Sequence, residues 1–214
     1  MKINIAHFLA RSQAEGPGWR AALWVQGCPI LCKGCINQEM LPFIDRHWVE
    51  VEALVTRILS INDIEGITFL GGEPFAQADA LAEVAQQVRH HGLSVMTFTG
   101  YTLEELYLKD EAGVKNLLAH TDLLISGPFI QERFTDKLPW IGSDNQEYHF
   151  LTERYRHMQS TLHTSNLNSV EVRLRADELH INGLLNHKMM RRIRDALKSG
   201  NIQLSPYKGD SYNE

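Results

Sequence analysis

All three cysteines of this 214-residue chain lie in one short stretch, at Cys28, Cys32 and Cys35. No thiol is left over to pair elsewhere, so no disulfide can cross-link distant parts of the chain. The spacing C-x3-C-x2-C lets three sulfurs point at a single centre, which is typical of a metal site. The fold must therefore be held by its buried core and must place this loop where a metal can be bound.

Two metals suit three neighbouring thiolates. Zinc usually takes four protein ligands in a closed structural site, and His7 or His47 could supply the fourth. Structural zinc sites favour paired C-x2-C knuckles, however, and this chain has one such pair. A [4Fe–4S] cluster held by three thiolates keeps one iron open for chemistry. The spacing favours the cluster over zinc and leaves both open.

Composition predicts an ordinary globular protein. Apolar residues make up 43% of the chain, charged residues make up 22%, and the formal net charge is −5. No broad basic excess exists for gripping nucleic acid, and no run of about 18 apolar residues exists to span a membrane. The N-terminus lacks the apolar core of a signal peptide. We expect a cytoplasmic protein whose thiols stay reduced, with neither a nucleic acid nor a membrane as partner.

Apolar periodicity alternates between strand and helix over much of the chain. The predicted strands cover residues 3–8, 21–25, 67–70, 93–99 and 122–126, and the predicted helices cover 48–59, 78–91, 103–108 and 112–120. Alternation at this pitch favours right-handed crossovers and a parallel sheet. The chain is too short for a complete eightfold barrel, so the sequence predicts an α/β fold of the partial, open (β/α) barrel type.

Two regions divide the chain. Residues 1–156 form the predicted barrel core, in which 130–147 is a long loop of the kind that is usually functional. Residues 157–214 form a C-terminal extension that packs on the same domain. A hairpin is predicted at 170–175 and 178–182, followed by a helix over 184–197 and a polar tail.

Four polar segments each follow a predicted strand. They begin at Cys28, Glu73, Thr99 and Ser126. In an α/β fold, sites gather at the carboxyl ends of the parallel strands, so these segments should meet at one mouth.

The motifs resemble those of the radical S-adenosylmethionine (radical SAM) enzymes. Within that superfamily the chain is similar to the small activating enzymes of glycyl-radical enzymes, above all the activases of anaerobic ribonucleotide reductase. The resemblance covers about residues 3–156. It is carried by the cysteine spacing, by Gly16-Pro17-Gly18-Trp19-Arg20 (family GPGxR), Gly34-Cys35-Ile36-Asn37 (GCxN), Gly71-Gly72-Glu73-Pro74 (GGEP), Thr99-Gly100-Tyr101 (TGY) and residues 140–146 (WRGSxNQ).

This resemblance implies both chemistry and site residues. The three cysteines would hold a [4Fe–4S] cluster whose open iron binds S-adenosylmethionine. Reductive cleavage of the sulfonium would yield a 5′-deoxyadenosyl radical that installs a glycyl radical on a partner enzyme. A one-electron donor such as a flavodoxin-like protein is implied. The cofactor-binding residues would be Asn37, Gly71, Gly72, Glu73, Pro74, Thr99 and Ser126, with Glu73 and nearby backbone carbonyls holding the cofactor's ammonium.

Ordinary structural roles compete with several of these assignments. Glycines commonly form turns, buried hydroxyls usually satisfy nearby backbone groups, and Asn37 could simply cap a loop. Residues 140–146 lie on a loop and are assigned to contact with a partner or substrate. The sequence departs from the activase pattern at Ile141, where Arg is expected, and at Ser126, where Asp is expected.

Two other functions remain open. The first is a small radical SAM enzyme that modifies a peptide or a small molecule such as a deazapurine precursor. The second is a metal-binding interaction module without catalysis. The departures at Ile141 and Ser126 bear on the substrate and leave the cofactor chemistry unaffected.

Overall fold

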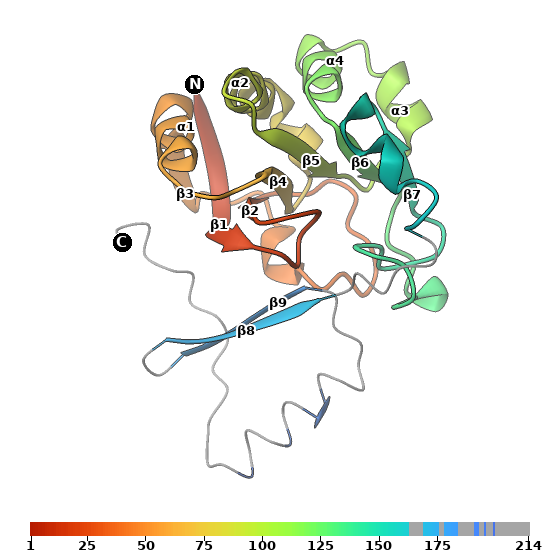
Figure 1. The fold of residues 1–214 in the computed structure, drawn as a ribbon. Coiled ribbons are helices and arrows are strands. Elements are labelled where there is room, and N and C mark those ends of the chain that lie inside the picture. Colours follow the sequence, from red (N-terminus) through yellow and green to blue (C-terminus); the bar gives the residue numbers. More distant parts are fainter. Residues whose placement is uncertain (163–168, 176–177, 184–190, 193–194, 196–198, 200–214) are drawn as a thin grey trace.

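A mixed sheet of seven strands forms the centre of the protein in this computed structural model (Figure 1). The structure describes residues 1–162, 169–175, 178–183, 191–192, 195 and 199. The strands lie in the order β3-β1-β2-β4-β5-β6-β7. Their bounds are β1 Lys2–Ser12, β2 Arg20–Val25, β3 His47–Glu50, β4 Gly66–Gly71, β5 Ser94–Phe98, β6 Leu123–Ser126 and β7 Glu147–Phe150.

The middle of the sheet is parallel. Strands β2, β4, β5 and β6 pair in parallel, whereas β1 and β3 on one side and β7 on the other pair antiparallel. Every residue of β2 is buried, as expected of a parallel strand covered on both faces. The predicted α/β class with a mostly parallel sheet is confirmed, and the antiparallel flanks are an addition to it.

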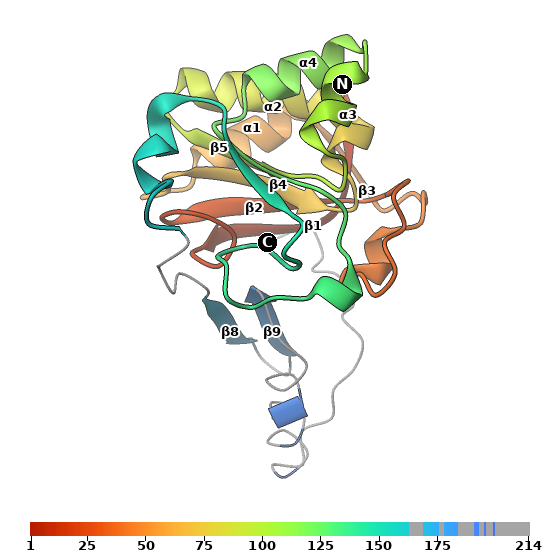
Figure 2. The same ribbon diagram turned by 90° about the vertical axis from the view of Figure 1, so that its right-hand side faces the viewer.

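The longer helices cover one face of the sheet (Figure 2). They are α1 Val51–Leu59, α2 Ala78–His90, α3 Leu103–Leu108 and α4 Ala112–Ala119. The apolar stripe of α2, with Leu81, Val84, Ala85 and Val88, is buried against the sheet in the main core. The helical periodicity in the sequence therefore identified the buried face correctly.

Two short strands differ from the sequence prediction. Residues 48–50 belong to β3 and not to the first helix, because Trp48 happens to continue the helical spacing of the residues that follow it. The side chain of Trp48 is 52% exposed, so it does not belong to the buried stripe of α1. Strand β7 is absent from the sequence prediction, whose loop 130–147 includes its first residue, because four residues are too few for a clear alternating pattern.

The C-terminal hairpin lies against the turn that follows β1. Strands β8 Val170–Arg175 and β9 Glu178–Gly183 pair antiparallel, as the sequence predicted. Asn182 Nδ2 donates to Ser12 Oγ at 2.9 Å, and the Gln13 amide donates to Glu171 Oε1 at 2.8 Å. The predicted helix over 184–197 lies almost entirely outside the described residues.

Glu15 makes this contact sensitive to pH. Its carboxyl is buried beneath the hairpin beside Asn182 and Glu171, and burial raises its pKa to about 7. Because the pKa is raised on folding, the protonated form stabilises the fold, and this contribution is lost as pH rises from 4.5 through 7. We expect the free energy of unfolding to fall by about 3 kcal/mol across this window on account of Glu15.

The variant Glu15→Gln tests this linkage, because its side chain stays neutral. Urea unfolding at several pH values between 5 and 8 gives the free energy of unfolding as a function of pH. This dependence on pH should be less steep in the variant, by the contribution of about one proton. Equal slopes in the two proteins would contradict the assignment. The exposed Glu52→Gln variant, on α1, is the matched control and should leave the slope unchanged.

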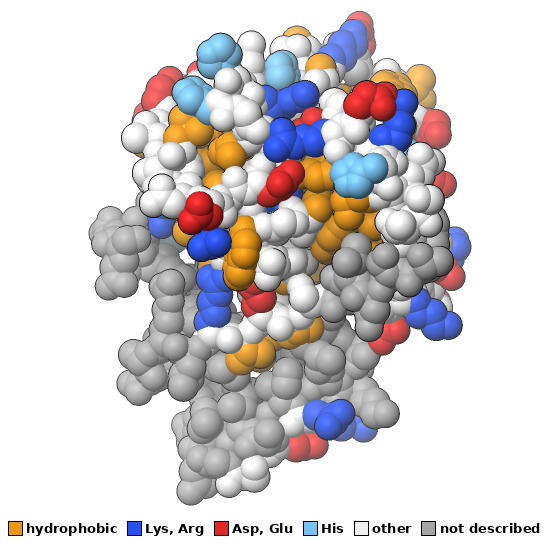
Figure 3. Space-filling model, viewed as in Figure 1, with side chains coloured by type: hydrophobic (Ala, Val, Ile, Leu, Met, Phe, Trp, Pro, Cys, Tyr) orange, Lys and Arg blue, Asp and Glu red, His pale blue; other side chains and the backbone are white. Residues whose placement is uncertain are grey.

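Charges of both signs are interspersed on the face that Figure 3 presents. Several ion pairs join exposed side chains, such as Arg156 with Glu153 and Arg133 with Asp144. Exposed pairs of this kind contribute little to stability. Among the described residues, no helix combines the length and the apolar character that crossing a bilayer requires.

Candidate functional site

The cysteine loop begins where β2 ends and is fixed there by backbone hydrogen bonds. The amide of Gly27 donates to Met40 O at 2.8 Å, and the amide of Cys28 donates to Leu41 O at 2.9 Å. Leu31, within the loop, has a φ of 55°, a left-handed conformation that is unfavourable for a branched side chain. Such strain is retained only where the surrounding structure imposes it, as is common at functional sites.

The three thiols lie in one loop and differ in burial. Cys28 is buried, and Cys32 and Cys35 are half-buried. Burial raises the pKa of Cys28 and of Cys35, and the charge of neighbouring cysteines raises both further. Backbone amides of Ile30 and Leu31 act on Cys28 in the opposite direction. Thiols that influence one another's ionisation in this way suit a cationic centre that would stabilise all three thiolates.

A zinc ion would need a fourth protein ligand beside the three thiols. In the part of the chain that the structure describes, no group of three or more His, Cys, Asp or Glu side chains converges closely enough to hold one metal ion. His7 instead packs against Trp24, with ring centroids 5.0 Å apart. Three neighbouring thiols, with backbone amides that lower the pKa of Cys28 and of Cys35, match the ligands and hydrogen bonds through which proteins hold and tune Fe–S clusters.

The GGEP segment packs directly against the start of the cysteine loop. The Gly72 amide donates to Val25 O at 2.8 Å, and the Glu73 amide donates to Gly27 O at 2.9 Å. A Cβ atom on Gly72 would overlap the carbonyl oxygen of Gly27, and one on Gly71 would lie 2.6 Å from the amide of Val25. Both glycines are therefore required for two backbones to approach closely. This packing role is additional to the predicted role of admitting a cofactor.

Glu73 joins the ends of β4 and β5. Its Oε1 accepts from the Phe75 amide and from Thr99 Oγ1, both at 2.9 Å, and its Oε2 accepts from the Gly100 amide at 2.8 Å. Glu73 also caps the 3-10 helix η2 (Pro74–Gln77), in which Pro74 occupies the first position. Burial raises the pKa of Glu73 to about 7.

Thr99 and Ser126 lie at the ends of β5 and β6, and Asn37 lies in the loop that follows Cys35. The Thr99 hydroxyl is occupied on both sides, donating to Glu73 and accepting from the Tyr101 amide. The Ser126 hydroxyl lies 2.7 Å from His149 Nε2 on β7. Asn37 acts on the pKa of Cys35 through its backbone amide, and its side chain does not cap the short helix η1 (Gln38–Met40).

Residues 140–146, predicted to contact a partner or substrate, are partly buried. Trp140 is 8% exposed and Ile141 and Ser143 are fully buried. Asp144 is exposed, so the contact stays a prediction for the exposed part of this loop. Ile141 packs in a second apolar cluster with Met96 and Ile125, which explains why this chain tolerates an apolar residue there. Gln146 accepts from the Gly142 and Ser143 amides and donates to Gly127 O, so the motif shapes the loop itself.

Sequence reasoning missed three amide side chains beneath the cysteine loop: Asn4, Gln26 and Gln77. Gln26 directly precedes Gly27-Cys28, yet its bonding partners Glu39 and Pro42 lie beyond the cysteines. Gln77 bonds to Asn4, 73 residues away. No local spacing links these residues, so no sequence signal could have found them.

The fold and this site define a class: an α/β protein with a three-thiolate Fe–S centre at the carboxyl edge of its parallel strands. Comparison with known proteins agrees, since residues 14–149 match the family model described as a 4Fe-4S single cluster domain.

Curated relatives define the family more narrowly. The anaerobic ribonucleoside-triphosphate reductase-activating protein of Vibrio cholerae is 35% identical over 158 residues, which are 70% of this chain and 99% of the relative. The proteins of the same name from Haemophilus influenzae and Escherichia coli K12 are 32% and 30% identical, and they cover 69% and 64% of this chain and 97% and 92% of their own length. The chain belongs to the family of anaerobic ribonucleoside-triphosphate reductase-activating proteins.

A solved structure was also matched. QueE from Escherichia coli aligns with a TM-score of 0.42 and 20% identity, over 48% of this chain and 54% of that chain. This similarity is too low to support an argument. Family membership, by contrast, confirms the predicted activase class, and the match to the cluster-domain model confirms the predicted [4Fe–4S] cluster.

Proposed function

We propose that this protein installs a glycyl radical on a partner anaerobic ribonucleotide reductase. The observation that carries the proposal is the direct joining of the cysteine loop to the GGEP segment through the Gly27 carbonyl and the Glu73 amide. The cluster ligands and the cofactor-binding segment are thereby held side by side. When bound, the cluster supplies the electron that cleaves S-adenosylmethionine.

Each group of site residues has a separate role in the proposed reaction. Cys28, Cys32 and Cys35 hold the cluster, and amides near Cys28 and Cys35 tune it. Gly71, Gly72, Glu73 and Pro74 form the edge that receives the amino acid end of the cofactor. Thr99 holds Glu73 in place, Ser126 lies at the end of β6, and Asn37 follows the last cysteine of the loop. The glycines bring the cofactor-binding edge within contact of the cysteine loop.

The proposal also covers the type of fold, the domain organisation and the electron donor. The parallel strands β2, β4, β5 and β6, with helices on one face, support an open (β/α) barrel. The contacts of the hairpin with Ser12 and Gln13 support residues 157–214 as an extension of the single domain formed with 1–156. A flavodoxin-like protein is the proposed electron donor.

An anaerobic reconstitution tests the function. The iron-loaded protein, S-adenosylmethionine, a reductant and the anaerobic reductase of the same organism are mixed and frozen for EPR. We expect a glycyl-radical doublet on the reductase and loss of that signal when S-adenosylmethionine is omitted. Turnover of S-adenosylmethionine to 5′-deoxyadenosine with no protein-borne radical would contradict the proposed partner while preserving the cofactor chemistry.

A further inference from the structure

We propose that Asn4, Gln26 and Gln77 form an amide latch that positions the first cluster cysteine. The latch acts by fixing residues 39–46, here called the strap, across the start of the cysteine loop. The three side chains are positioning residues, because they contact the backbone of the loop and of the strap. The proposal deepens the proposed function and rests on it only for the role of the cluster.

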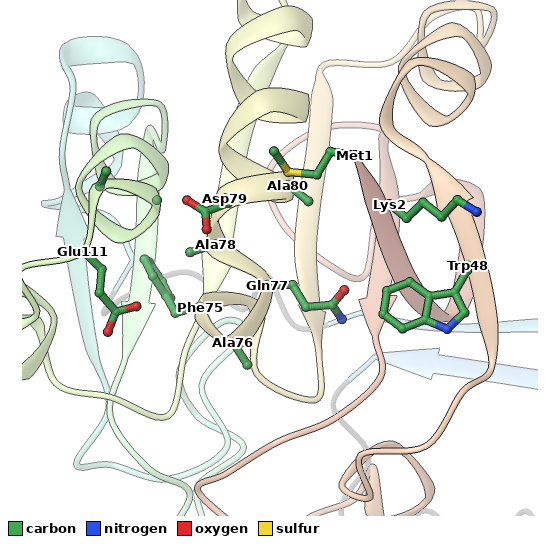
Figure 4. Close-up of a pocket in the computed structure, with 12 residues that line it drawn as sticks. Met1, Lys2, Trp48, Phe75, Ala76, Gln77, Ala78, Asp79, Ala80 and Glu111 are labelled. Carbon is green, nitrogen blue, oxygen red and sulfur yellow. The ribbon is translucent and has the colours of Figure 1, made fainter.

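Gln77 holds two strands at once. Its Oε1 accepts from the Asn4 amide at 2.8 Å, and its Nε2 donates to Asn4 O at 3.0 Å and to Gln26 O at 3.1 Å. One side chain from η2, directly after the GGEP segment, is therefore bonded to β1 and to the residue that precedes Gly27. Figure 4 shows Gln77, directly before α2, in the wall of a surface groove that Trp48 and Phe75 also line.

The side chains of Asn4 and Gln26 form hydrogen bonds with the backbone of the strap. Asn4 Nδ2 donates to Ile44 O at 2.7 Å, and Asn4 Oδ1 accepts from the Arg46 amide at 3.0 Å. Gln26 Nε2 donates to Pro42 O at 2.6 Å and to Glu39 O at 3.2 Å. Both side chains are buried, with 7% and 2% of their surfaces exposed, so water cannot easily replace these bonds.

The strap in turn fixes Cys28. Its carbonyls at Met40 and Leu41 accept the amides of Gly27 and Cys28, and Gly72 packs against the Met40 carbonyl. The cysteine loop, the GGEP segment and the strap thus share one set of backbone bonds, which the latch holds in register. Positions fixed in this way preorganise a site before its cofactor arrives.

The latch also accounts for an exposed apolar side chain beside Gly27, at the start of the cysteine loop. Phe43 is 68% exposed, yet its ring lies over Gly27 next to Cys28. A strap without buried anchors could rearrange to cover this ring. The bonds to Pro42 and Ile44, on either side of Phe43, prevent such a rearrangement.

Hydrogen exchange on the metal-free protein tests the latch without reference to activity. In Gln77→Leu and in Asn4→Leu, exchange at the amides of Gly27, Cys28 and Arg46 should accelerate about tenfold relative to the rest of the sheet. The matched control is Gln87→Leu on α2, the helix that follows Gln77, where the Gln87 side chain contacts Glu83. In this control variant, hydrogen exchange at the same three amides should equal that of wild type.

The loaded protein provides the second measurement. We expect the latch variants to retain their iron, because all three thiols remain, and to show an altered EPR spectrum of the reduced cluster with S-adenosylmethionine. Gln77→Glu keeps the acceptor for the Asn4 amide, so its hydrogen-exchange rates should lie between those of wild type and Gln77→Leu. This variant replaces the leucine variants in the test if those do not fold. Unchanged exchange at Gly27 and Cys28 in both Gln77 variants, or an equal change in Gln87→Leu, would overturn the latch. Both results are independent of whether a reductase accepts the radical.

Discussion

Replacing Cys32 by alanine should abolish reductive cleavage of S-adenosylmethionine while leaving the fold intact. Cys32 is half-buried in a loop and is a free thiol in this structure, so its loss should change the free energy of unfolding by no more than about 1 kcal/mol. The three thiols act as one unit in holding a cluster, and losing any member of such a unit removes nearly all activity. Formation of 5′-deoxyadenosine should fall at least about a thousandfold.

The measurement combines three readouts on anaerobically reconstituted protein: iron content, 5′-deoxyadenosine formed, and far-ultraviolet circular dichroism. Lys33→Ala is the control, since Lys33 is exposed in the same loop and lies next to the replaced thiol. The control should retain iron and activity. A Cys32→Ala protein that still produced 5′-deoxyadenosine at the wild-type rate would refute the assignment of the cluster ligands.

The fold was predictable where each element carries its own periodic signal. Helix α2 shows a complete stripe, and β2 is a continuous apolar run, so both were identified from sequence. Strand β3 has four residues and an exposed Trp48 that imitates helical spacing. The antiparallel direction of β1 also left no local trace, because strand direction is decided by pairing with β2 and not by the residues of β1.

The site was predictable to the extent that its residues are close in sequence. The cysteines and the GGEP segment are short local motifs, whereas the bonds from Glu73 to Thr99 and Gly100 join strand ends 26 and 27 residues apart. The burial of part of residues 140–146 was not predictable, because a loop position suggests exposure. Burial of Trp140 and Ile141 depends on the face of the sheet that they cover, which no spacing within the loop reveals.

Arg20 lies at the opposite end of the sheet from the thiols, and its buried guanidinium requires hydrogen-bond acceptors. It is fully buried at the start of β2 and bonds to neutral groups: Nε to Thr68 Oγ1 at 2.6 Å, Nη1 to Pro17 O at 2.8 Å and Nη2 to Ile67 O at 2.9 Å. Tyr155 connects it to an acid, accepting from Nη1 at 3.2 Å and donating to Glu65 at 3.0 Å. The guanidinium thus ties the turn after β1 to β2, β4 and η4 (Glu153–Met158).

Replacing Arg20 by methionine should therefore have the largest effect on stability. The variant fills much of the volume but leaves the Pro17 and Ile67 carbonyls and the Thr68 hydroxyl without this donor, which should cost about 3–5 kcal/mol. For a protein of this length the midpoint of thermal unfolding should fall by about 10 °C. Arg156→Met, which removes an exposed pair with Glu153, should shift the midpoint by no more than about 2 °C. Thermal unfolding of the metal-free proteins measures both midpoints. Equal midpoints for the two variants would show that water or a rearrangement of the turn replaces the buried hydrogen bonds of Arg20.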